Sequence, residues 1–353
     1  MTRETPLSTP VVSVLMLAYN HANYIKDAID GVLRQRVAFP IELIIAEDCS
    51  SDATREIVMD YQRRHPDLIQ VIISGSNVGM HENHLRALRA CKGEYVAYCE
   101  GDDYWHHPDK LAMQVAAMRA DPAIGLVHTE FDYRVESLVG RRMMQAESRE
   151  VPSGDAFEAL LRGYNLATAT LMYRKRALDQ FESAGLDESG YQFGDYCRAL
   201  FTSLHFKLAF LPVSTATYRY MPGSAMNSGP ASTLRLRQSG VQCRKDFMAM
   251  TGRVPDDLAA VERDEQRLLY GNAYLARDKA AFKAVADWLQ QHDPAWSGGL
   301  RHQVRQVLMR VPPLHRLVQK RAHRQWWRSV KHRLVPMTIE QQVNAAMREA
   351  DGA

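Results

Sequence analysis

The sequence has few cysteines, and their spacing suggests no pairing. Its 353 residues include five cysteines, scattered along the chain without a C-x-x-C motif. Small exported domains carry closely spaced cysteine pairs, whereas scattered cysteines are typical of a reducing compartment. The pattern therefore argues against a disulfide framework. It favours a cytoplasmic protein in which the cysteines are small core residues.

Long hydrophobic runs are also missing. The first residues, MTRETPLST, contain no apolar stretch of signal-peptide length. No segment approaches the roughly 20 apolar residues that a membrane-spanning helix needs. We therefore expect a chain that is neither exported nor inserted in a membrane. A net charge of +3 over the whole chain indicates no particular partner.

Up to about residue 130, short β-rich runs alternate with helical stretches. This alternation predicts βαβ units and a mostly parallel sheet. Parallel strands are covered on both faces, which explains why these runs are almost continuously apolar. The predicted strands are 11–17, 41–46, 69–74 and 94–99, and the predicted helices are 24–35, 52–64 and 82–90.

Polar residues follow three of the predicted strands, at the point where each strand ends. In parallel α/β sheets, ligands bind at the carboxyl ends of the strands. The sequence therefore predicts a binding site at this edge of the sheet. Its candidate residues are Tyr19 and Asn20 after the first strand, Glu47 and Asp48 after the second, and Glu100, Asp102 and Asp103 after the fourth.

The most specific of these segments is EGDDYW, at residues 100–105. Neighbouring carboxylates repel one another unless a cation lies between them. Carboxylate oxygens suit Mg²⁺ or Mn²⁺ better than Zn²⁺, and such a cation is readily shared with a diphosphate. An acidic surface turn is the alternative, and an isolated pair of aspartates would favour it.

Six segments follow one another in an order typical of a single enzyme family. They are VVSVLMLAYN, IIAEDCSSDAT, NVGMHENHLRAL, GEYVAYCEGDDYWHHPDKL, FGDYCRAL and TYRYMPGS. Together they make residues 10–225 resemble the inverting glycosyltransferase family 2, whose members have the GT-A fold. The resemblance implies an α/β fold with a mostly parallel central sheet. It also implies a hexosyltransferase-type enzyme that moves a sugar from a nucleotide-sugar donor to an acceptor hydroxyl.

The resemblance assigns donor-binding roles residue by residue. It implies that Tyr19 stacks on the base, with Asn20 beside it, and that Asp48 hydrogen-bonds the base or ribose. Asp102 is then directed towards the ribose or the donor sugar, and Arg219 lies near the diphosphate. A UDP-sugar is the expected donor, with dTDP and GDP as alternatives.

The resemblance also implies the chemistry. Asp103 corresponds to the metal ligand and Asp195 to the catalytic base. Asp195 would take the proton of the acceptor hydroxyl in an in-line displacement that inverts the anomeric centre. Mg²⁺ or Mn²⁺ would neutralise the departing diphosphate. The chain departs from the family pattern at Glu47, Cys49, Glu100 and Tyr220, so the roles of these four positions stay open.

Two other functions are compatible with an α/β sheet that carries acidic residues. A nucleotidyltransferase would have a phosphate-binding loop rich in Gly, Arg or Lys after the first strand, and LAYNHANY lacks one. A non-catalytic scaffold would bind a nucleotide sugar without turnover. The preferred interpretation is a transferase that acts on a glycan or glycolipid in bacterial surface polysaccharide or lipopolysaccharide synthesis.

Several nearby residues have simpler interpretations. His81 and His84 are expected on a surface helix, and His106 and His107 in an exposed loop. Trp105 either lines a pocket or packs in the core.

Beyond residue 130 the pattern predicts a strand at 166–173, a helix at 196–204, strands at 206–210 and 213–218, and a loop at 222–230. Residues 232–289 read as helical. We therefore expect a catalytic domain at 1–230, a helical extension at 231–300 and a basic amphipathic segment at 301–353.

The last of these segments has an unusual charge distribution. Residues 301–337 contain ten Lys or Arg and no Asp or Glu, interleaved with Leu, Val, Trp326 and Trp327. This composition suits an interfacial segment on an anionic membrane, at the inner face of the cytoplasmic membrane. Nucleic acid is disfavoured because nothing nearby resembles a nucleic-acid-binding fold. A solvated helical face or an oligomer contact remains an alternative.

Overall fold

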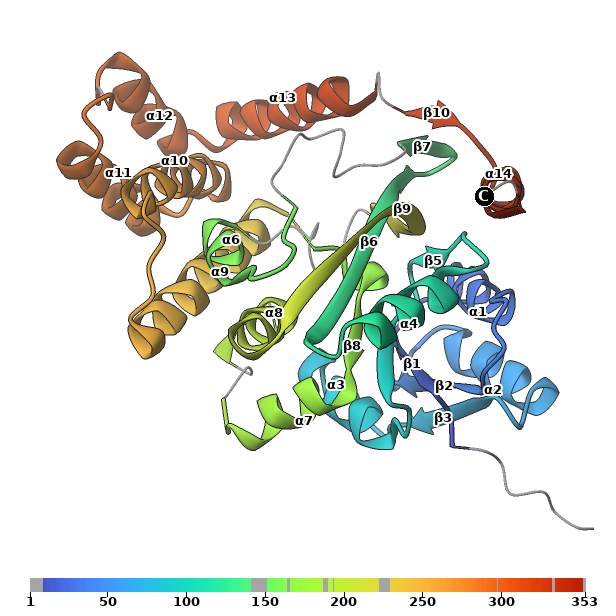
Figure 1. Ribbon diagram of the computed structural model, residues 1–353. Coiled ribbons are helices and arrows are strands. Elements are labelled where there is room, and N and C mark those ends of the chain that lie inside the picture. The colour runs from blue at the N-terminus through green and yellow to red at the C-terminus, as the bar shows by residue number, and fades with distance from the viewer. Residues whose placement is uncertain are drawn as a thin grey trace, which may run out of the picture.

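The computed structural model describes residues 9–140, 151–163, 166–186, 190–192, 194–221, 229–296, 298–331 and 334–351. Four parallel strands form one side of its sheet (Figure 1). In spatial order they are β3 (Ile69–Ile73), β2 (Ile41–Glu47), β1 (Val12–Ala18) and β4 (Tyr95–Tyr98). The four strands predicted from the sequence are confirmed, with small shifts at their ends.

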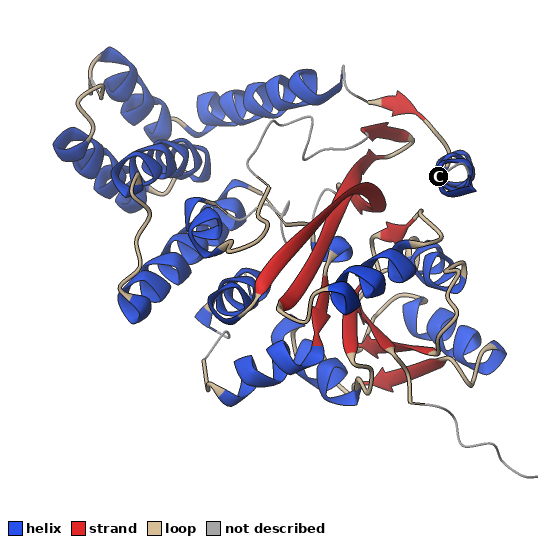
Figure 2. Ribbon diagram, viewed as in Figure 1, coloured by secondary structure: helices blue, strands red, loops and turns tan. Residues whose placement is uncertain are grey.

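Helices cover both faces of this sheet (Figure 2). Val14 and Met16 of β1 pack into one core, whereas Leu15 packs into the other. The first core is completed by α1 (Ile25–Leu33), α2 (Thr54–Arg64) and α4 (Lys110–Ala120). The second is completed by α3 (Met80–Ala90), α6 (Phe157–Arg162), α7 (Lys175–Ser183) and α8 (Gly194–His205). Burial on both sides accounts for the apolar runs in the sequence.

Beyond β4 the sheet continues with mixed strand directions. β8 (Met172–Arg174) is antiparallel to both β4 and β6 (Ile124–Val135), and β9 (Lys207–Arg219) runs parallel to β6. β7 (Leu138–Gly140) forms a hairpin with β6, and the short β5 (Tyr104–Trp105) pairs with β9. The predicted α/β fold with a mostly parallel centre and a helical C-terminal region is confirmed.

Most of the strand predicted at 166–173 is wrong. These residues form the 3₁₀ turn η1 (Thr168–Thr170) before the chain enters β8. The Thr170 hydroxyl donates to the carbonyl of Ala167 at 2.6 Å, and such local bonds compete with strand pairing. The strands predicted at 206–210 and 213–218 are confirmed, but they form the single strand β9, whose register against β6 shifts near Glu130. Most of the predicted loop at 222–230 lies outside the described residues.

The helical extension has a core of its own. It consists of α9 (Pro230–Thr251), α10 (Leu258–Ala276) and α11 (Lys279–His292), followed by α12 (Leu300–Arg310) and α13 (Pro312–Lys331). Leu269, Ala273 and Phe282 are buried between them. In the part of the chain that the structure describes, none of the helices is long and apolar enough to cross a membrane.

The last described residues return to the sheet. β10 (Val335–Pro336) pairs antiparallel with β7, and α14 (Ile339–Asp351) follows it (Figure 1). Arg36 and Asp351 form an ion pair of 2.7 Å. The predicted boundaries at 230 and 300 stay predictions, but residues 334–351 do not extend the basic segment, because they pack against the predicted catalytic domain.

A buried histidine makes stability depend on pH. His128 is fully buried and donates through Nε2 to the carbonyl of Pro152 at 2.7 Å. Burial lowers the pKa of His128 from 6.5 to about 4. The unfolded chain therefore binds a proton first as pH falls, and the folded state loses on the order of 3 kcal/mol between pH 6.5 and pH 4.

We expect His128→Gln, which keeps an N–H donor but cannot be protonated, to remove this part of the acid sensitivity. Urea unfolding at pH 7 and pH 4.5 measures it. The matched control is His205→Gln at an exposed position. Equal losses of stability in the wild type and His128→Gln would contradict the assignment.

Candidate active site

The acidic turn, residues 100–103, is fixed to the end of β1. The backbone N–H of Cys99 donates to the carbonyl of Leu15, and that of Gly101 donates to the carbonyl of Leu17, at 3.1 and 3.0 Å. A Cβ at Gly101 would lie 2.7 Å from Nδ1 of His21 and 2.8 Å from the Leu17 carbonyl oxygen. The turn can therefore approach β1 this closely only with glycine at position 101.

Arg219 braces the acidic turn from β9. Its backbone N–H donates to Oδ1 of the buried Asp103 at 2.8 Å, and its guanidinium donates to the carbonyl of Asp102 at 3.2 Å. The guanidinium also forms an ion pair with Asp27 of α1 and lies 4.6 Å from the ring centre of Tyr104. Asp27 was missed by the sequence analysis, because one aspartate in a helix carries no signal of its partner.

Glu100 links the acidic turn to Asp195. Burial, followed by the negative charges of Asp102 and Asp195, raises the pKa of Glu100 to about 8, and the positive charge of Arg198 opposes this. Asp195 therefore lies close enough to the acidic turn to act on it electrostatically. Segments more than 90 residues apart in the sequence thus bring carboxylates together at one edge of the sheet.

Asp195 lies in the first turn of α8 and is partly exposed. Its Oδ1 accepts the backbone N–H of Tyr196 at 2.9 Å, and its Oδ2 accepts the hydroxyl of Thr168 at 3.1 Å. These bonds hold the carboxylate in one orientation.

Comparison with known proteins adds to this geometry. Residues 13–181 match the profile of Glycosyl transferase family 2.

The chain resembles several bacterial proteins. It is 37% identical over 171 residues to the uncharacterized protein Rv1520 of Mycobacterium tuberculosis, covering 42% of this chain and 49% of the relative. It is 38% identical over 110 residues to the putative teichuronic acid biosynthesis glycosyltransferase TuaG of Bacillus subtilis, covering 31% of this chain and 42% of the relative. The chain thus spans about half the length, or less, of these curated relatives.

Two solved structures share its fold. Mannosyltransferase PcManGT from Pyrobaculum calidifontis, in complex with GDP-Man and Mn²⁺, has a TM-score of 0.56 at 18% identity over 88% of this chain and 84% of its own. TarS residues 1–349 of S. aureus, in complex with UDP, have a TM-score of 0.51 at 17% identity over 79% and 78% of the two chains. The GT-A fold predicted from the sequence is thereby confirmed.

Three of the predicted donor-binding residues lie at the same edge of the sheet. Tyr19 is 45% exposed directly after β1. Asn20 has a positive φ of 56°, and its Oδ1 accepts the backbone N–H of Ser51 at 2.9 Å. Asp48 is buried and accepts the N–H groups of Val78 and Gly79 at 2.8 and 3.0 Å. Asn20 and Asp48 thus connect neighbouring loops. The contacts of Tyr19, Asn20 and Asp48 with a donor stay predictions.

Glu47, a departure from the family pattern, has a structural role. Its fully buried carboxylate accepts the N–H of Ser50 and pairs with Arg55, both at 2.6 Å. These contacts hold the turn in which Cys49 has a φ of 59°.

His21 also belongs to this region, although the sequence offered no signal for it. Burial lowers the pKa of His21, while the charges of Asp102 and Asp52 raise it. The backbone N–H of His21 donates to the Thr54 hydroxyl at 2.7 Å. His21 therefore lies between the acidic turn and the start of α2.

Three of the histidines that were predicted to be exposed are buried, namely His84, His106 and His107. His84 contacts the Tyr98 hydroxyl at 3.0 Å. His106 contacts the Thr217 hydroxyl at 2.9 Å, and Nδ1 of His107 accepts the Asp109 N–H at 3.2 Å. Each can be buried because a polar partner is available. Of the two interpretations of Trp105, packing is correct, since it is 1% exposed and donates to the Ala169 carbonyl at 2.8 Å.

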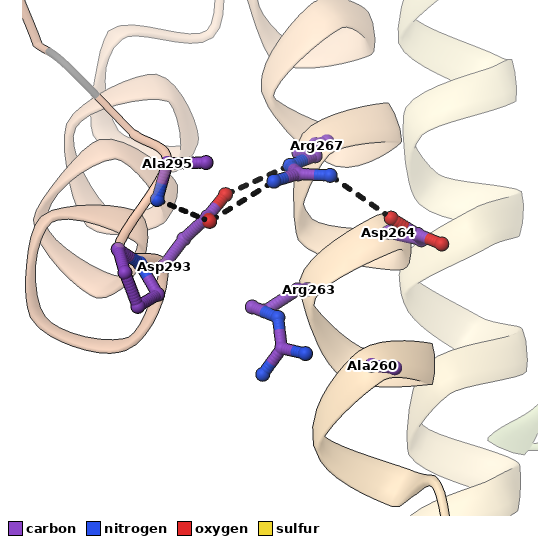
Figure 3. Close-up of a pocket in the computed structure, with 7 residues that line it drawn as sticks. Ala260, Arg263, Asp264, Arg267, Asp293 and Ala295 are labelled. Atoms are coloured by element: carbon purple, nitrogen blue, oxygen red, sulfur yellow. Dashed lines mark hydrogen bonds and ion pairs between the residues drawn. The ribbon is translucent and has the colours of Figure 1, made fainter.

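A hollow of about 380 Å³ lies in the helical extension instead of the acidic edge (Figure 3). It is lined by Arg263, Arg267 and Asp293, among others. Arg267 pairs with both oxygens of Asp293, at 2.7 and 2.9 Å, and with Asp264 at 3.2 Å. None of the predicted site residues lines this hollow, so it does not correspond to the predicted donor site.

The close approach at Gly101 gives a stability test of the site. We expect Gly101→Ala to destabilise the fold by roughly 1–3 kcal/mol, because the added methyl group would overlap backbone of β1. The urea midpoint measures this loss. Gly75→Ala, where a Cβ would meet nothing within 4 Å, is the matched control. Equal midpoints for the two variants would show that the turn can move away from β1 to accommodate a methyl group at position 101.

Proposed function

We propose that this chain is a metal-dependent, inverting glycosyltransferase that uses a nucleotide-sugar donor. The observation that carries the proposal is the convergence of Asp195 with the acidic turn that contains Asp102 and Asp103. The match of residues 13–181 to the family profile supports the transferase class. The donor, the metal and the stereochemistry go beyond that match.

The acidic turn fits a divalent cation that is bound by one protein carboxylate and mainly by the phosphates of the donor. Burial and the charges of Asp102 and Glu100 raise the pKa of Asp103 well above its usual range, although the N–H and the positive charge of Arg219 oppose this. Among the described residues, no three His, Cys, Asp or Glu side chains form a cluster that could hold a metal. Mg²⁺ is commonly bound by one or two carboxylates together with substrate phosphates. We therefore assign Asp103 as a single protein ligand.

Each residue then has one task. The backbone N–H of Arg219 holds Oδ1 of Asp103, which orients the carboxylate towards a cation. Tyr19 offers an exposed ring for a base, and Asp102 faces the ribose or donor sugar. Asp195, oriented by Thr168, accepts the proton of the acceptor hydroxyl as it attacks the anomeric carbon. A bound Mg²⁺ or Mn²⁺ would supply Lewis-acid neutralisation of the leaving diphosphate.

The likeness to other proteins supports the choice of substrates. The solved neighbours contain UDP in one case and GDP-Man with Mn²⁺ in the other. TuaG is named for teichuronic acid biosynthesis, and a further relative, 30% identical over 120 residues, is a chondroitin synthase of Escherichia coli. We infer that the preferred donor is a UDP-sugar, with a GDP-sugar as the second choice. The inferred acceptor is a glycan or lipid-linked glycan in surface polysaccharide or lipopolysaccharide synthesis.

We expect Asp195→Asn to lower kcat by about 10²–10⁴-fold while donor binding persists, because only the general base is lost. Asp103→Ala is expected to abolish Mn²⁺-dependent donor binding as well as turnover. Release of nucleoside diphosphate from a panel of nucleotide sugars, with and without Mn²⁺, measures turnover, and calorimetry measures binding. Asp256→Asn, at an exposed position in the extension, is the matched control.

The same assay separates the other functions. Wild-type turnover in Asp195→Asn or Asp103→Ala would refute the assigned roles. Donor binding without turnover in the wild type would indicate a scaffold, and release of pyrophosphate would indicate a nucleotidyltransferase. The anomeric configuration of the product, read by NMR, tests inversion.

We further propose that α12 and α13 form a peripheral contact with an anionic membrane. Leu300, Val304 and Val307 lie on one face of α12 and are 76%, 46% and 59% exposed, and Val311, which follows the helix, is 37% exposed. Exposed basic residues accompany them on both helices, namely Arg301, Arg310, Arg316, Lys320, Arg321 and Arg324. Apolar side chains beside positive charges suit the surface of an anionic bilayer. The side chains of Trp326 and Trp327 lie outside the described part of the structure.

We expect Val304→Ser combined with Val307→Ser to weaken vesicle binding about 30-fold, because each valine contributes on the order of 1 kcal/mol at an apolar surface. Co-sedimentation with vesicles of phosphatidylglycerol and phosphatidylcholine measures binding, with phosphatidylcholine alone as the reference. Val254→Ser combined with Leu268→Ser changes similarly exposed residues on other elements and is the control. Equal binding by both double variants would reject this surface. Point variants are preferable to truncation, because residues 334–351 pack on the sheet.

A further inference from the structure

The C-terminal strap, residues 334–351, crosses the sheet next to the acidic turn. At its start, Arg134 donates to the carbonyl of Met337, and the N–H of Met337 donates to the carbonyl of Ser137, both at 3.0 Å. At its end, Asp351 pairs with Arg36. The strap is therefore held at both ends, with α14 between them.

One side chain of α14 enters the sheet. Gln342 is 1% exposed. Its Nε2 donates to Oδ2 of Asp132 at 2.6 Å and to the hydroxyl of Thr217 at 2.8 Å, and its Oε1 accepts the hydroxyl of Tyr104 at 2.6 Å. An ionised carboxylate only accepts hydrogen bonds, so Asp132 fixes which end of the amide faces it. Gln342 thus uses both donors and its acceptor in a buried network.

This network is continuous with the acidic turn. Tyr104 follows Asp103 directly, and Tyr104 lies opposite Thr217 in the β5–β9 pair. Gln342 therefore bridges both strands at the register position next to the bond between Asp103 and the Arg219 N–H. The Arg219 guanidinium also lies over the Tyr104 ring. A shift of Gln342 would therefore move Tyr104, which is bonded covalently to Asp103. It would also move Thr217, which is separated from Arg219 by one residue of β9.

We propose that Gln342 is a positioning residue, through which the C-terminal strap sets the geometry of Asp103 and Arg219 and so controls donor affinity. Gln342 touches neither substrate nor cation in this proposal, which rests on the proposed function. Through Gln342 alone, the strap acts on the donor site without forming part of it. Buried polar networks of this kind specify one arrangement because a broken bond leaves an unpaired group behind.

The test reverses the donors and acceptors of this network. Gln342→Glu keeps the shape of the side chain but places a carboxylate against that of Asp132, where the two charges repel. We expect about a tenfold weaker Mn²⁺-dependent affinity for UDP by calorimetry and a matching rise in the donor KM, within the coupling range known for residues in one network. The change in kcat should be smaller. Asn344→Ala, at an exposed position on the same helix, should match the wild type.

A compensating change distinguishes positioning from simple destabilisation. In Gln342→Glu combined with Asp132→Asn, the new amide can donate to the new carboxylate, so UDP affinity should return to within about threefold of the wild type. If Gln342→Glu fails to fold, Gln342→Met removes the hydrogen bonds without adding charge, and a weaker UDP affinity is again expected.

Three outcomes decide the proposal. Wild-type UDP affinity and donor KM in a folded Gln342→Glu variant would overturn the positioning role of the strap but leave the proposed function intact. If only Gln342→Met folds, the same result in that variant would have the same meaning. Loss of thermal stability without a change in affinity would overturn it in the same way. A wild-type chain that binds no nucleotide or nucleotide sugar would overturn both proposals together.

Discussion

Electrostatic repulsion among carboxylates at the end of β4 is the constraint on which the rest of the site depends. Glu100, Asp102 and Asp103 lie in one turn, and Asp195 adds its charge from α8. Burial strengthens this repulsion, because low-dielectric surroundings screen charge poorly. Such a cluster persists only where the fold supplies enough rigidity to hold it, and the surroundings of the turn show several devices that do so.

These devices come from different parts of the chain. β1 holds the backbone of the turn, and β9 supplies the N–H of Arg219 to Asp103. Asp27 of α1 pairs with the Arg219 guanidinium, which keeps that positive charge beside the carboxylates. Behind the strands, Gln342 joins β5, β6 and β9 in one network. The sheet therefore fixes positions while a layer of polar side chains fixes orientations, which is the arrangement that a precise catalytic site requires.

Sequence patterns predicted the centre of the fold well because its elements are local and periodic. β1, β2 and β4 are apolar runs of strand length followed by polar residues, and that pattern alone placed Tyr19, Asp48 and Asp103 at one edge. The strand prediction at 166–173 was wrong because threonine side chains there bond locally, for example Thr170 to Ala167. His106 was expected to be exposed because its partner Thr217 is more than 100 residues away.

By itself, the sequence determined the α/β architecture, the resemblance of residues 13–181 to a family profile and the acidic residues at the strand ends, because these follow from short-range pattern and motif order. Only the tertiary structure decided that Arg219 braces Asp103, that Asp27 pairs with Arg219, and that Gln342 reaches the sheet from the C-terminus. Such contacts join side chains that are far apart in the sequence, and a sequence pattern does not specify these pairs. Once the sheet has formed, each contact is energetically necessary, because a buried polar group without a partner is costly.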